Sequence, residues 1–384
     1  MTAISPPPLS LYVHMPWCVR KCPYCDFNSH TAGPETQRAR YLAALERDLK
    51  AEAANPAGRP LISVFIGGGT PSLFTAAEIG RLLDAVSKHF SLADDIEITL
   101  EANPGTVECG EPHGYRAAGV NRLSIGAQSF RPDMLAVLGR IHSVEDIHRS
   151  VAAAQAAGFD NINIDVMYAL PGQSVGQAVE DLECAIELEP THLSWYQLTL
   201  EPNTVFHARP PNGMPDDDAC FDIQLAGQEL LDQRGFEQYE VSAYARAGRH
   251  CRHNVNYWSF GDYLAVGAGA HGKITADGEV RRYAKPANPL AYMEAQESGT
   301  ATPGLRALGD AERVFEFMLN ALRLTNGFDT RLFEERTGLA LDTVDEQFAA
   351  LREKQLIDDV GNGFWRVTGL GKRFLNDVQA EFLP

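Results

Sequence analysis

The chain has 384 residues, of which 45% are hydrophobic, and this length suits one large α/β unit with one or two smaller ones. Its formal charge of −18 does not suit a protein whose main task is to bind the phosphates of DNA or RNA, so no nucleic-acid partner is expected. No apolar run is long enough to cross a bilayer, and the first residues lack the basic and apolar segments of a secretory signal. We therefore expect a cytoplasmic protein.

Six short apolar runs in the first two hundred residues predict buried parallel strands, at 11–14, 61–66, 96–100, 122–126, 162–167 and 192–198. Helical patterns lie between these runs, and Thr75 with Glu78 forms a capping-box pattern before one of the helices. Serial βα units imply a parallel sheet with right-handed crossovers, but six units are too few for a closed eight-stranded barrel. The predicted fold is therefore an open partial barrel or a doubly wound sheet.

The pattern changes after residue 200. A long loop is predicted at 201–218, a helix at 219–234 and one strand at 236–244. The last eighty residues predict three helices and a hairpin about Gly361-Asn362-Gly363, an order that resembles a winged-helix module. Because this segment is not notably basic, a packing or partner-binding role is favoured over DNA binding. The expected domains are 1–235, 236–304 and 305–384.

Three of the seven cysteines, Cys18, Cys22 and Cys25, follow the first predicted strand with the spacing C-x3-C-x2-C. An odd number of cysteines without a signal peptide argues against a disulfide framework. Thiolates this close along one loop can hold an iron–sulfur cluster, and four irons with three thiolates leave one iron open to a ligand. The alternative is a zinc site with His14 or His30 as the fourth ligand, although no second pair of ligands follows at the usual distance.

Other predicted strands also end in glycines or polar side chains. Gly67–Gly69 follow the second strand, Glu101 the third and Gln128 the fourth, and Asp165 lies late in the fifth. Each has an ordinary alternative: a tight turn for the glycines, a loop cap for Asp165, and a solvated side chain for Glu101. Because the carboxyl ends of parallel strands meet at one edge, these residues and the cysteines together predict one built site.

The chain resembles the radical SAM superfamily, and most closely the branch that contains the oxygen-independent coproporphyrinogen III oxidases and the haem chaperones of the HemW type. The resemblance extends over almost the whole chain and rests on segments such as LYVHMPWC, CPYCDF, FIGGGTPS, RLSIGAQSF and NINIDVMYALPGQ. It implies a partial (β/α)6 barrel with a winged-helix-like C-terminal α+β domain. It also implies that Cys18, Cys22 and Cys25 ligate a 4Fe–4S cluster, from which an electron cleaves S-adenosylmethionine (SAM) to methionine and a 5′-deoxyadenosyl radical. The SAM contacts implied by matching positions are Tyr12, Tyr24, Gly68, Gly69, Thr70, Glu101, Gln128, Arg140 and Asp165.

Two features separate the branches. The oxidases carry a fourth cysteine where this chain has Phe27, and a long segment before the position of Tyr12, where this chain has eleven residues. In addition, residues 253–258 read HNVNYW, which matches the chaperones' H-N-x-x-Y-W haem-binding motif and implies that haem contacts His253, Asn254, Tyr257 and Trp258. The alternative is that the two aromatic side chains belong to the core and that His253 is a hydrogen-bonded surface residue.

The resemblance therefore favours a chaperone that binds haem and transfers it to apo-haemoproteins, with respiratory enzymes at the inner membrane as acceptors and a homodimer as the acting form. The implied cofactors are the 4Fe–4S cluster, SAM and haem, and no electron donor is named by the sequence. The first alternative is the oxygen-independent coproporphyrinogen III oxidase, an enzyme. A second alternative, a radical SAM enzyme that modifies RNA, is disfavoured by the acidic charge and the lack of a basic RNA-binding module.

Overall fold

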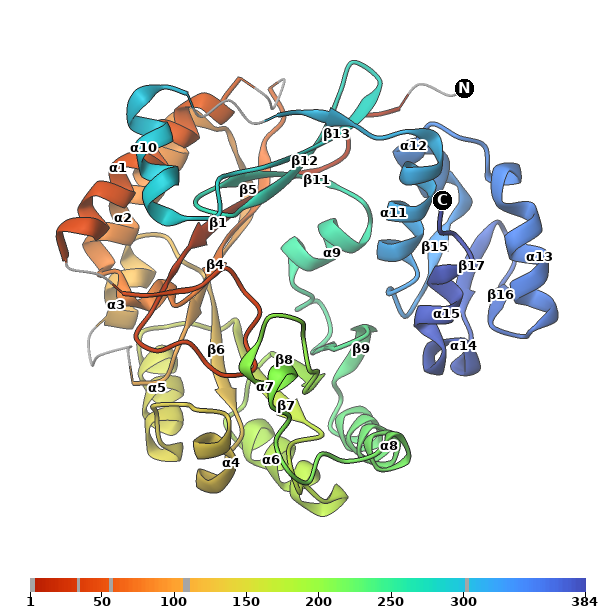
Figure 1. Ribbon diagram of the computed structural model, residues 1–384, viewed down its shortest axis with the longest axis horizontal. Helices are drawn as coiled ribbons and strands as arrows, with labels where there is room; N and C mark the ends of the chain where they lie inside the picture. The colour runs from red at the N-terminus through yellow and green to blue at the C-terminus, as the bar shows by residue number, and fades with distance from the viewer. Residues whose placement is uncertain (1–3, 33–34, 55–57, 106–110, 301–303) are drawn as a thin grey trace.

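A single curved sheet dominates the computed structural model, which describes residues 4–32, 35–54, 58–105, 111–300 and 304–384 (Figure 1). Neighbouring strands at its centre are all parallel. In spatial order they are β11 (Asp262–Val266), β1 (Leu9–Met15), β4 (Leu61–Gly68), β5 (Leu92–Ala102), β6 (Arg122–Gln128), β7 (Ile162–Tyr168) and β8 (His192–Gln197). The predicted parallel α/β sheet is confirmed, and β11 joins it as a strand beyond the six expected ones.

Antiparallel strands extend the sheet at both edges. Beyond β11 lie β12 (His271–Ala276), β13 (Glu279–Ala284) and β14 (Arg306–Ala307). Beyond β8 lie β10 (Ala243–Ala245) and β9 (Glu237–Glu240), so the single strand predicted at 236–244 is wrong and is a hairpin instead. The carboxylate of Glu240 accepts the backbone N–H of Ser242 at 3.0 Å, which stabilises the turn between the two strands. Strands from the expected middle domain thus continue the same sheet.

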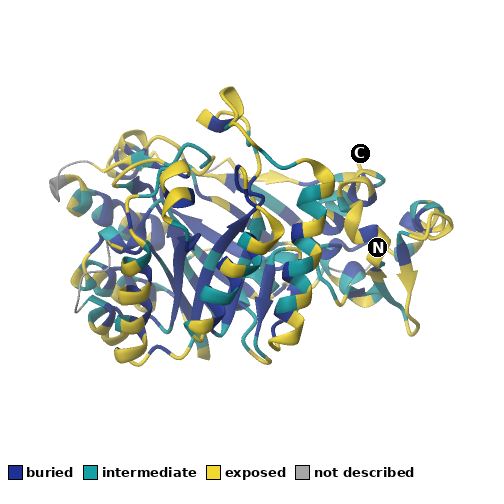
Figure 2. Cartoon of the chain, turned by 90° about the horizontal axis from the view of Figure 1, so that it is seen from below, coloured by how far each residue is buried: buried dark blue, intermediate teal, exposed yellow. Residues whose placement is uncertain are grey.

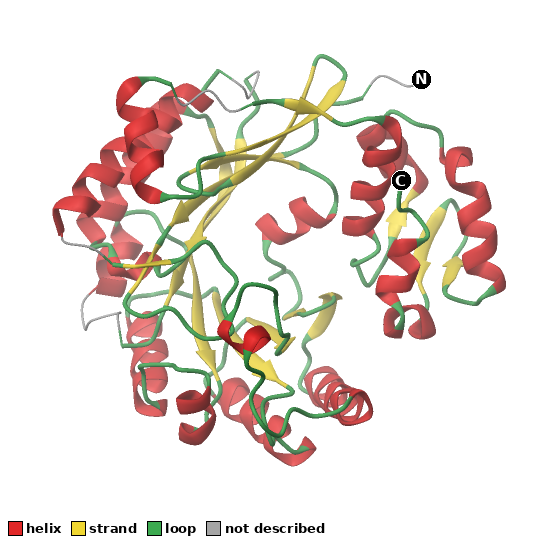
Figure 3. Cartoon of the chain, in the orientation of Figure 1, coloured by secondary structure: helices red, strands yellow, loops and turns green. Residues whose placement is uncertain are grey.

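Helices cover the outer face of the sheet (Figures 1 and 3). Thr75 and Glu78 form the predicted capping box at the start of α2, whose buried side chains include Ile79, Leu82 and Val86. None of the helices in the described part of the chain is long and apolar enough to cross a membrane. The outer helices are α1 (Glu35–Glu52), α2 (Ala76–His89), α3 (Glu111–Ala117), α4 (Pro132–Val137), α5 (Val144–Ala156), α6 (Val175–Glu187), α8 (Asp217–Gln233) and α10 (Pro289–Ser298).

The parallel strands are buried on both faces, as their near-continuous apolar sequences predict (Figure 2). On the inner side of the curved sheet, α9 (Arg252–Trp258) contacts β1, β4 and β11. The same helix also contacts α11 (Asp310–Ala321) of the C-terminal unit. Helix α9 therefore lies between the sheet and the C-terminal unit, and its sequence is the HNVNYW segment.

The C-terminal unit has its own apolar core around Phe317, Phe333 and Phe348. Its short strands form a three-stranded antiparallel sheet in the order β15, β17, β16, which agrees with the predicted helices and hairpin. After α11 the elements are β15 (Phe328–Asp329), α12 (Thr330–Thr337), a 3-10 helix (Leu341–Val344), α13 (Asp345–Glu353), β16 (Ile357–Asp359), β17 (Phe364–Val367), α14 (Gly369–Arg373) and α15 (Leu375–Ala380).

Candidate functional site

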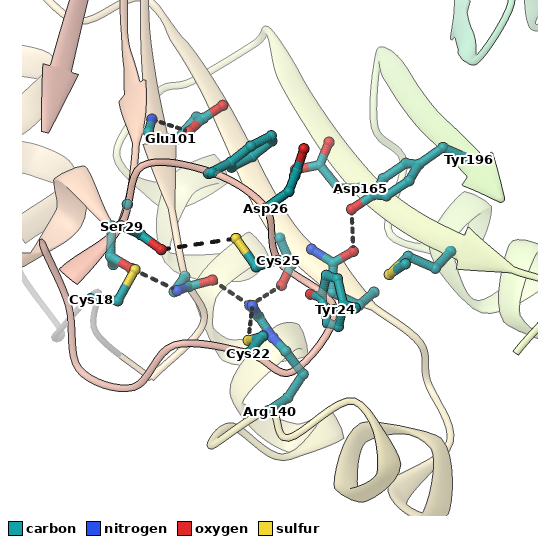
Figure 4. Close-up of a pocket in the computed structure, with 18 of the residues that line it drawn as sticks. Cys18, Cys22, Tyr24, Cys25, Asp26, Ser29, Glu101, Arg140, Asp165 and Tyr196 are labelled. Carbon is teal, nitrogen blue, oxygen red and sulfur yellow. Dashed lines mark hydrogen bonds between the residues drawn. The ribbon is translucent and has the colours of Figure 1, made fainter. Parts of the chain in front are cut away.

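The carboxyl ends of the parallel strands surround a cavity of about 410 Å³, called here the cysteine cavity (Figure 4). All three clustered cysteines line it, and so do all the side chains expected to contact SAM except Tyr12. The topology therefore brings together residues that lie more than a hundred positions apart in the sequence. The expected residues in its wall are Cys18, Cys22, Tyr24, Cys25, Gly68, Gly69, Thr70, Glu101, Gln128, Arg140 and Asp165.

The cysteines lie on a loop closed by two short parallel strands, β2 (Trp17–Cys18) and β3 (His30–Thr31). Inside the loop, the backbone N–H of Cys25 donates to the carbonyl of Cys22 at 3.2 Å. Burial raises the pKa of the Cys18 and Cys25 thiols. The guanidinium of Arg140 lies 3.7 Å from the Cys22 sulfur, and this positive charge suits a thiolate.

The histidines proposed for a zinc site are already engaged. His14 Nε2 lies 2.8 Å from the Asn28 carbonyl, which can only accept, so this nitrogen carries the proton. Its other nitrogen, Nδ1, then accepts from the Tyr12 hydroxyl at 2.9 Å. His30 Nε2 lies 3.2 Å from the side-chain oxygen of Asn28. Among the described residues, no group of three metal-binding side chains converges on a point that one ion could occupy.

The glycine loop after β4 packs directly against the strand that precedes the cysteines. The N–H groups of Gly69 and Thr70 donate to the carbonyls of Met15 and Trp17 at 2.6 and 2.8 Å. Gly68 has a φ of +113°, and a Cβ there would lie 2.5 Å from the His14 ring. A Cβ at Gly69 would lie 2.7 Å from the Trp17 carbonyl. Glycine is required at both positions for this close approach.

Two carboxyl groups face the cavity from β5 and β7. Glu101 Oε2 accepts the Gly68 N–H at 3.0 Å, while burial and the nearby Asp165 raise the pKa of Glu101 to about 8. Burial also raises the pKa of Asp165, although hydrogen bonds from its neighbours oppose this effect. Arg140 donates to the Gly126 carbonyl at 2.8 Å and to Asn103, and its buried Nε has no partner within the described part of the chain.

Gln128 is aimed into the cavity by an irregular backbone. The register of β6 against β7 shifts between Gly126 and Gln128, and Gln128 has a φ of +74°. Its side-chain oxygen accepts the Tyr196 hydroxyl at 2.6 Å. Tyr196 also lines the cavity but was not among the expected site residues, although its position near the end of the sixth predicted strand indicated the same edge of the sheet.

A second cavity of about 440 Å³, called here the α9 cavity, adjoins the first. The two share Phe27, Gly68 and Glu101 in their walls. Aromatic and imidazole rings dominate the α9 cavity, which also receives Tyr12. The side chains around it come from β1, the cysteine loop, α9 and the β11–β12 region, and they include Tyr12, His14, Phe27, His253, Tyr257, Tyr263 and His271.

His253 is half-buried and lies with its ring against Phe65, with centroids 4.9 Å apart. Its buried Nδ1 has no hydrogen-bond partner among the described residues. Burial, and then the positive charge of Arg122, lower the pKa of His253 to about 4. At neutral pH the ring is therefore an uncharged imidazole, and its half-buried position against Phe65 differs from the surface residue of the alternative interpretation.

Two of the residues expected at haem do not line the α9 cavity. Residues four apart on a helix share a face, so His253 and Tyr257 point together and Asn254 and Trp258 point elsewhere. Asn254 Nδ2 lies 3.5 Å from the Tyr239 hydroxyl. Trp258 packs edge-to-face on Tyr257, at 4.9 Å between centroids, and the Arg323 guanidinium lies 4.2 Å above it. Trp258 thus joins α9 to the C-terminal unit.

The side chains present fit the groups that the resemblance implies. Three thiols around one cavity are the donors of an iron–sulfur cluster. The unpartnered nitrogen of Arg140 suits a carboxylate, and Asp165 suits a pair of hydroxyl groups, as SAM would require. The neutral imidazole of His253 suits an axial position on haem iron.

Two family models match the chain. The model of the radical SAM superfamily matches residues 12–185, and the model of the HemN C-terminal domain matches residues 308–374. The chain is 46% identical to a protein of Haemophilus influenzae named "Heme chaperone HemW", over 98% of both chains. It is 46% identical to the protein of the same name from Escherichia coli, over 98% of both, and 33% identical to that of Bacillus subtilis, over 97% of this chain and 99% of the other.

Among solved structures, coproporphyrinogen III oxidase (HemN) from Escherichia coli, described as a radical SAM enzyme, is similar in fold. The match has a TM-score of 0.83 and covers 98% of this chain and 90% of the other, at 25% sequence identity. Both the curved sheet and the C-terminal unit therefore follow the architecture of that enzyme.

Proposed function

We propose that this chain, which belongs to the HemW family of radical SAM proteins, binds haem and passes it to apo-haemoproteins. The relatives named haem chaperones span nearly the whole chain at 33–46% identity. The observation that carries the proposal for these residues is the α9 cavity, where the neutral imidazole of His253 lies among aromatic rings. Such a wall suits a flat apolar porphyrin with one axial ligand to its iron.

In this proposal the cysteine cavity holds the 4Fe–4S cluster on Cys18, Cys22 and Cys25, with SAM beside it. When bound, the cluster and SAM supply one-electron chemistry. The protein's part is to bind and orient: Gly68 and Gly69 let the backbone approach the ligand, Arg140 holds a carboxylate, and Asp165 accepts hydroxyl groups. Tyr24, Thr70, Glu101 and Gln128 complete the wall.

Haem in turn is assigned to the α9 cavity. His253 would supply a nitrogen ligand to the iron, and the rings of Tyr12 and Tyr257, which also line the cavity, would offer apolar faces to the porphyrin. Phe27 is 58% exposed, so its apolar ring lies at the boundary of both cavities and of solvent. Asn254 and Trp258 then act indirectly, by fixing α9 against Tyr239 and Arg323.

The proposed acceptors are apo-haemoproteins, with respiratory enzymes at the inner membrane as the first candidates and a homodimer as the acting form. A cytoplasmic site, beside that membrane when haem is delivered, is supported by the cysteines: all six that the structure describes are free thiols. The acidic charge of −18 gives no support to a nucleic-acid partner.

The second candidate function is oxygen-independent coproporphyrinogen III oxidation. It is favoured by the fold shared with the Escherichia coli oxidase. It is disfavoured by Phe27, which stands where the oxidases are expected to have a fourth cysteine. We expect Phe27→Cys to leave decarboxylation undetectable in the anaerobic assay described next, because His253, Tyr257 and the other aromatic side chains of the α9 cavity remain in place.

The deciding experiment uses the protein with its cluster reconstituted under anaerobic conditions. It is incubated with SAM, a reductant and coproporphyrinogen III while decarboxylation is followed, and haem is titrated in parallel. Haem binding without decarboxylation supports the chaperone. Decarboxylation at enzymatic rates supports the oxidase and contradicts the proposal.

A further inference from the structure

A chain of hydrogen-bonded side chains leads from the cysteine cavity into the interior of the sheet. It begins at Asp165, whose Oδ1 accepts from Asn163 Nδ2 at 2.8 Å and whose Oδ2 accepts from the Ser124 hydroxyl at 3.3 Å. The same Asn163 nitrogen donates to Ser124 Oγ at 2.7 Å. Both hydrogens of the Asn163 amide are thus directed toward Asp165 and the serine beside it.

The direction of the remaining bonds follows from that amide. Asn163 Oδ1 faces the other way and lies 2.6 Å from His192 Nδ1, so this nitrogen must carry the proton. His192 Nε2 then accepts from the Tyr239 hydroxyl, which lies at 2.8 Å. His192 is fully buried, and burial together with the charge of Arg122 keeps its pKa well below the ordinary value. The ring is therefore neutral and has one tautomer.

We propose that His192 is a positioning residue for Asp165: its Nδ1–H fixes the amide of Asn163, which holds the carboxylate ready for the ribose hydroxyls of SAM. The Ser194 hydroxyl also donates to Asn163 Oδ1, at 3.1 Å, so without the imidazole only this longer bond, among the described residues, holds the amide oxygen away from Asp165. If the amide turned over, its oxygen would face the carboxylate, which can only accept. His192 lines neither cavity, and no role in binding SAM or haem has been given to it above. The inference rests on the proposed binding of SAM at Asp165.

Two substitutions test the contributions of the two ring nitrogens separately. In His192→Asn the side-chain amide occupies the place of Nδ1 and can donate to Asn163, whereas in His192→Gln it reaches toward the place of Nε2 and loses that contact. We expect the SAM dissociation constant of the cluster-loaded protein to rise about tenfold in His192→Gln and less than about threefold in His192→Asn. Tyr239→Phe, which removes only the distant hydroxyl, should also stay within about threefold.

The readout that excludes a merely structural effect is a SAM analogue without the 2′- and 3′-hydroxyls. Because Asp165 acts on those hydroxyls, His192→Gln should bind the analogue as well as the native chain does, with unchanged cluster absorbance and thermal unfolding. Equal losses in His192→Asn and His192→Gln, or an equal loss for SAM and the analogue, would overturn the inference. A native chain that binds haem but no SAM would instead remove its premise and leave the haem proposal standing.

Discussion

The two cavities share three residues but are built in different ways. The cysteine cavity is lined by the thiols, by Arg140 and by the carboxyl groups of Glu101 and Asp165, and it draws on one loop and on the ends of strands that the topology brings to one edge. The α9 cavity is aromatic and depends on one short helix, which arrives from far along the chain. The comparison teaches that strand ends converge by topology alone, whereas the α9 cavity exists only if α9 is held in place.

The largest expected effect separates the cavities by removing the cluster. Cys22→Ser should abolish the iron–sulfur absorbance of the reconstituted protein, because two thiolates remain where three are needed. Haem affinity should stay within about threefold, since no cysteine lines the α9 cavity. Cys184→Ser, on outer helix α6, is the matched control and should change neither signal. Loss of haem together with the cluster would show that the cavities are not independent.

The next effect concerns Glu101, which belongs to both walls. Its pKa is raised to about 8 from the ordinary 4.5, so between these values the folded chain holds a proton that the unfolded chain has released. Stability from this group is fully present below the unfolded pKa and is lost as pH rises toward about 8. We expect the free energy of unfolding of the cluster-free chain to fall less over this window in Glu101→Gln, by up to about 5 kcal/mol.

Asp165 contributes to the slope that remains in Glu101→Gln. The pKa of Asp165 is also raised by burial, so its contribution has the same sign. Glu187→Gln, at an exposed position of α6, serves as the control and should keep the native slope. Identical slopes in Glu101→Gln and the native chain, followed by denaturant unfolding, would mean that water reaches the shared wall.

A smaller effect tests the α9 cavity alone. His253→Ala should weaken haem binding by about tenfold or more, because the axial nitrogen is lost, while the cluster absorbance stays intact. Asn254→Ala is the matched control on the same helix, since its side chain points to Tyr239 and not into the cavity, and should stay within about threefold. Equal losses in both variants, in a haem titration, would assign the effect to α9 as a whole.

The same contrast explains what the sequence could predict. The six parallel strands and the Thr75 cap depend on local patterns, and both were predicted correctly. The strand β11 pairs with β1 across some 250 positions, for example Leu9 with Asp262, and no local pattern carries that pairing. Glu101, Gln128 and Asp165, at the strand ends of the cysteine cavity, were therefore identified, while Tyr196 was missed and β11 was not recognised as part of the parallel sheet.

In the HNVNYW segment the resemblance indicated which residues could contact haem, but not which of their side chains point into the cavity. A helix was not predicted at 252–258, and without its period His253 and Asn254 could not be assigned to different faces. Tyr12 was expected at SAM, but its hydroxyl is bound to His14 and its ring lies in the α9 cavity. These positions follow from side-chain packing between distant segments, which sequence spacing does not determine.

The smallest expected effect is the absence of a pH dependence, and it tests how dry the α9 cavity is. The pKa of His253 is lowered to about 4, so protons compete with haem iron for its ring only near that value. A histidine with an ordinary pKa of about 6.5 would lose about tenfold in affinity for each pH unit below it. We expect the ratio of haem affinities between the native chain and His253→Ala to stay constant within about twofold from pH 8 to 5.5. Using the ratio removes the titration of haem itself from the comparison. A tenfold fall in that ratio between pH 6.5 and 5.5 would mean that the imidazole titrates as in water, and that the α9 cavity is as open to solvent as an ordinary surface site.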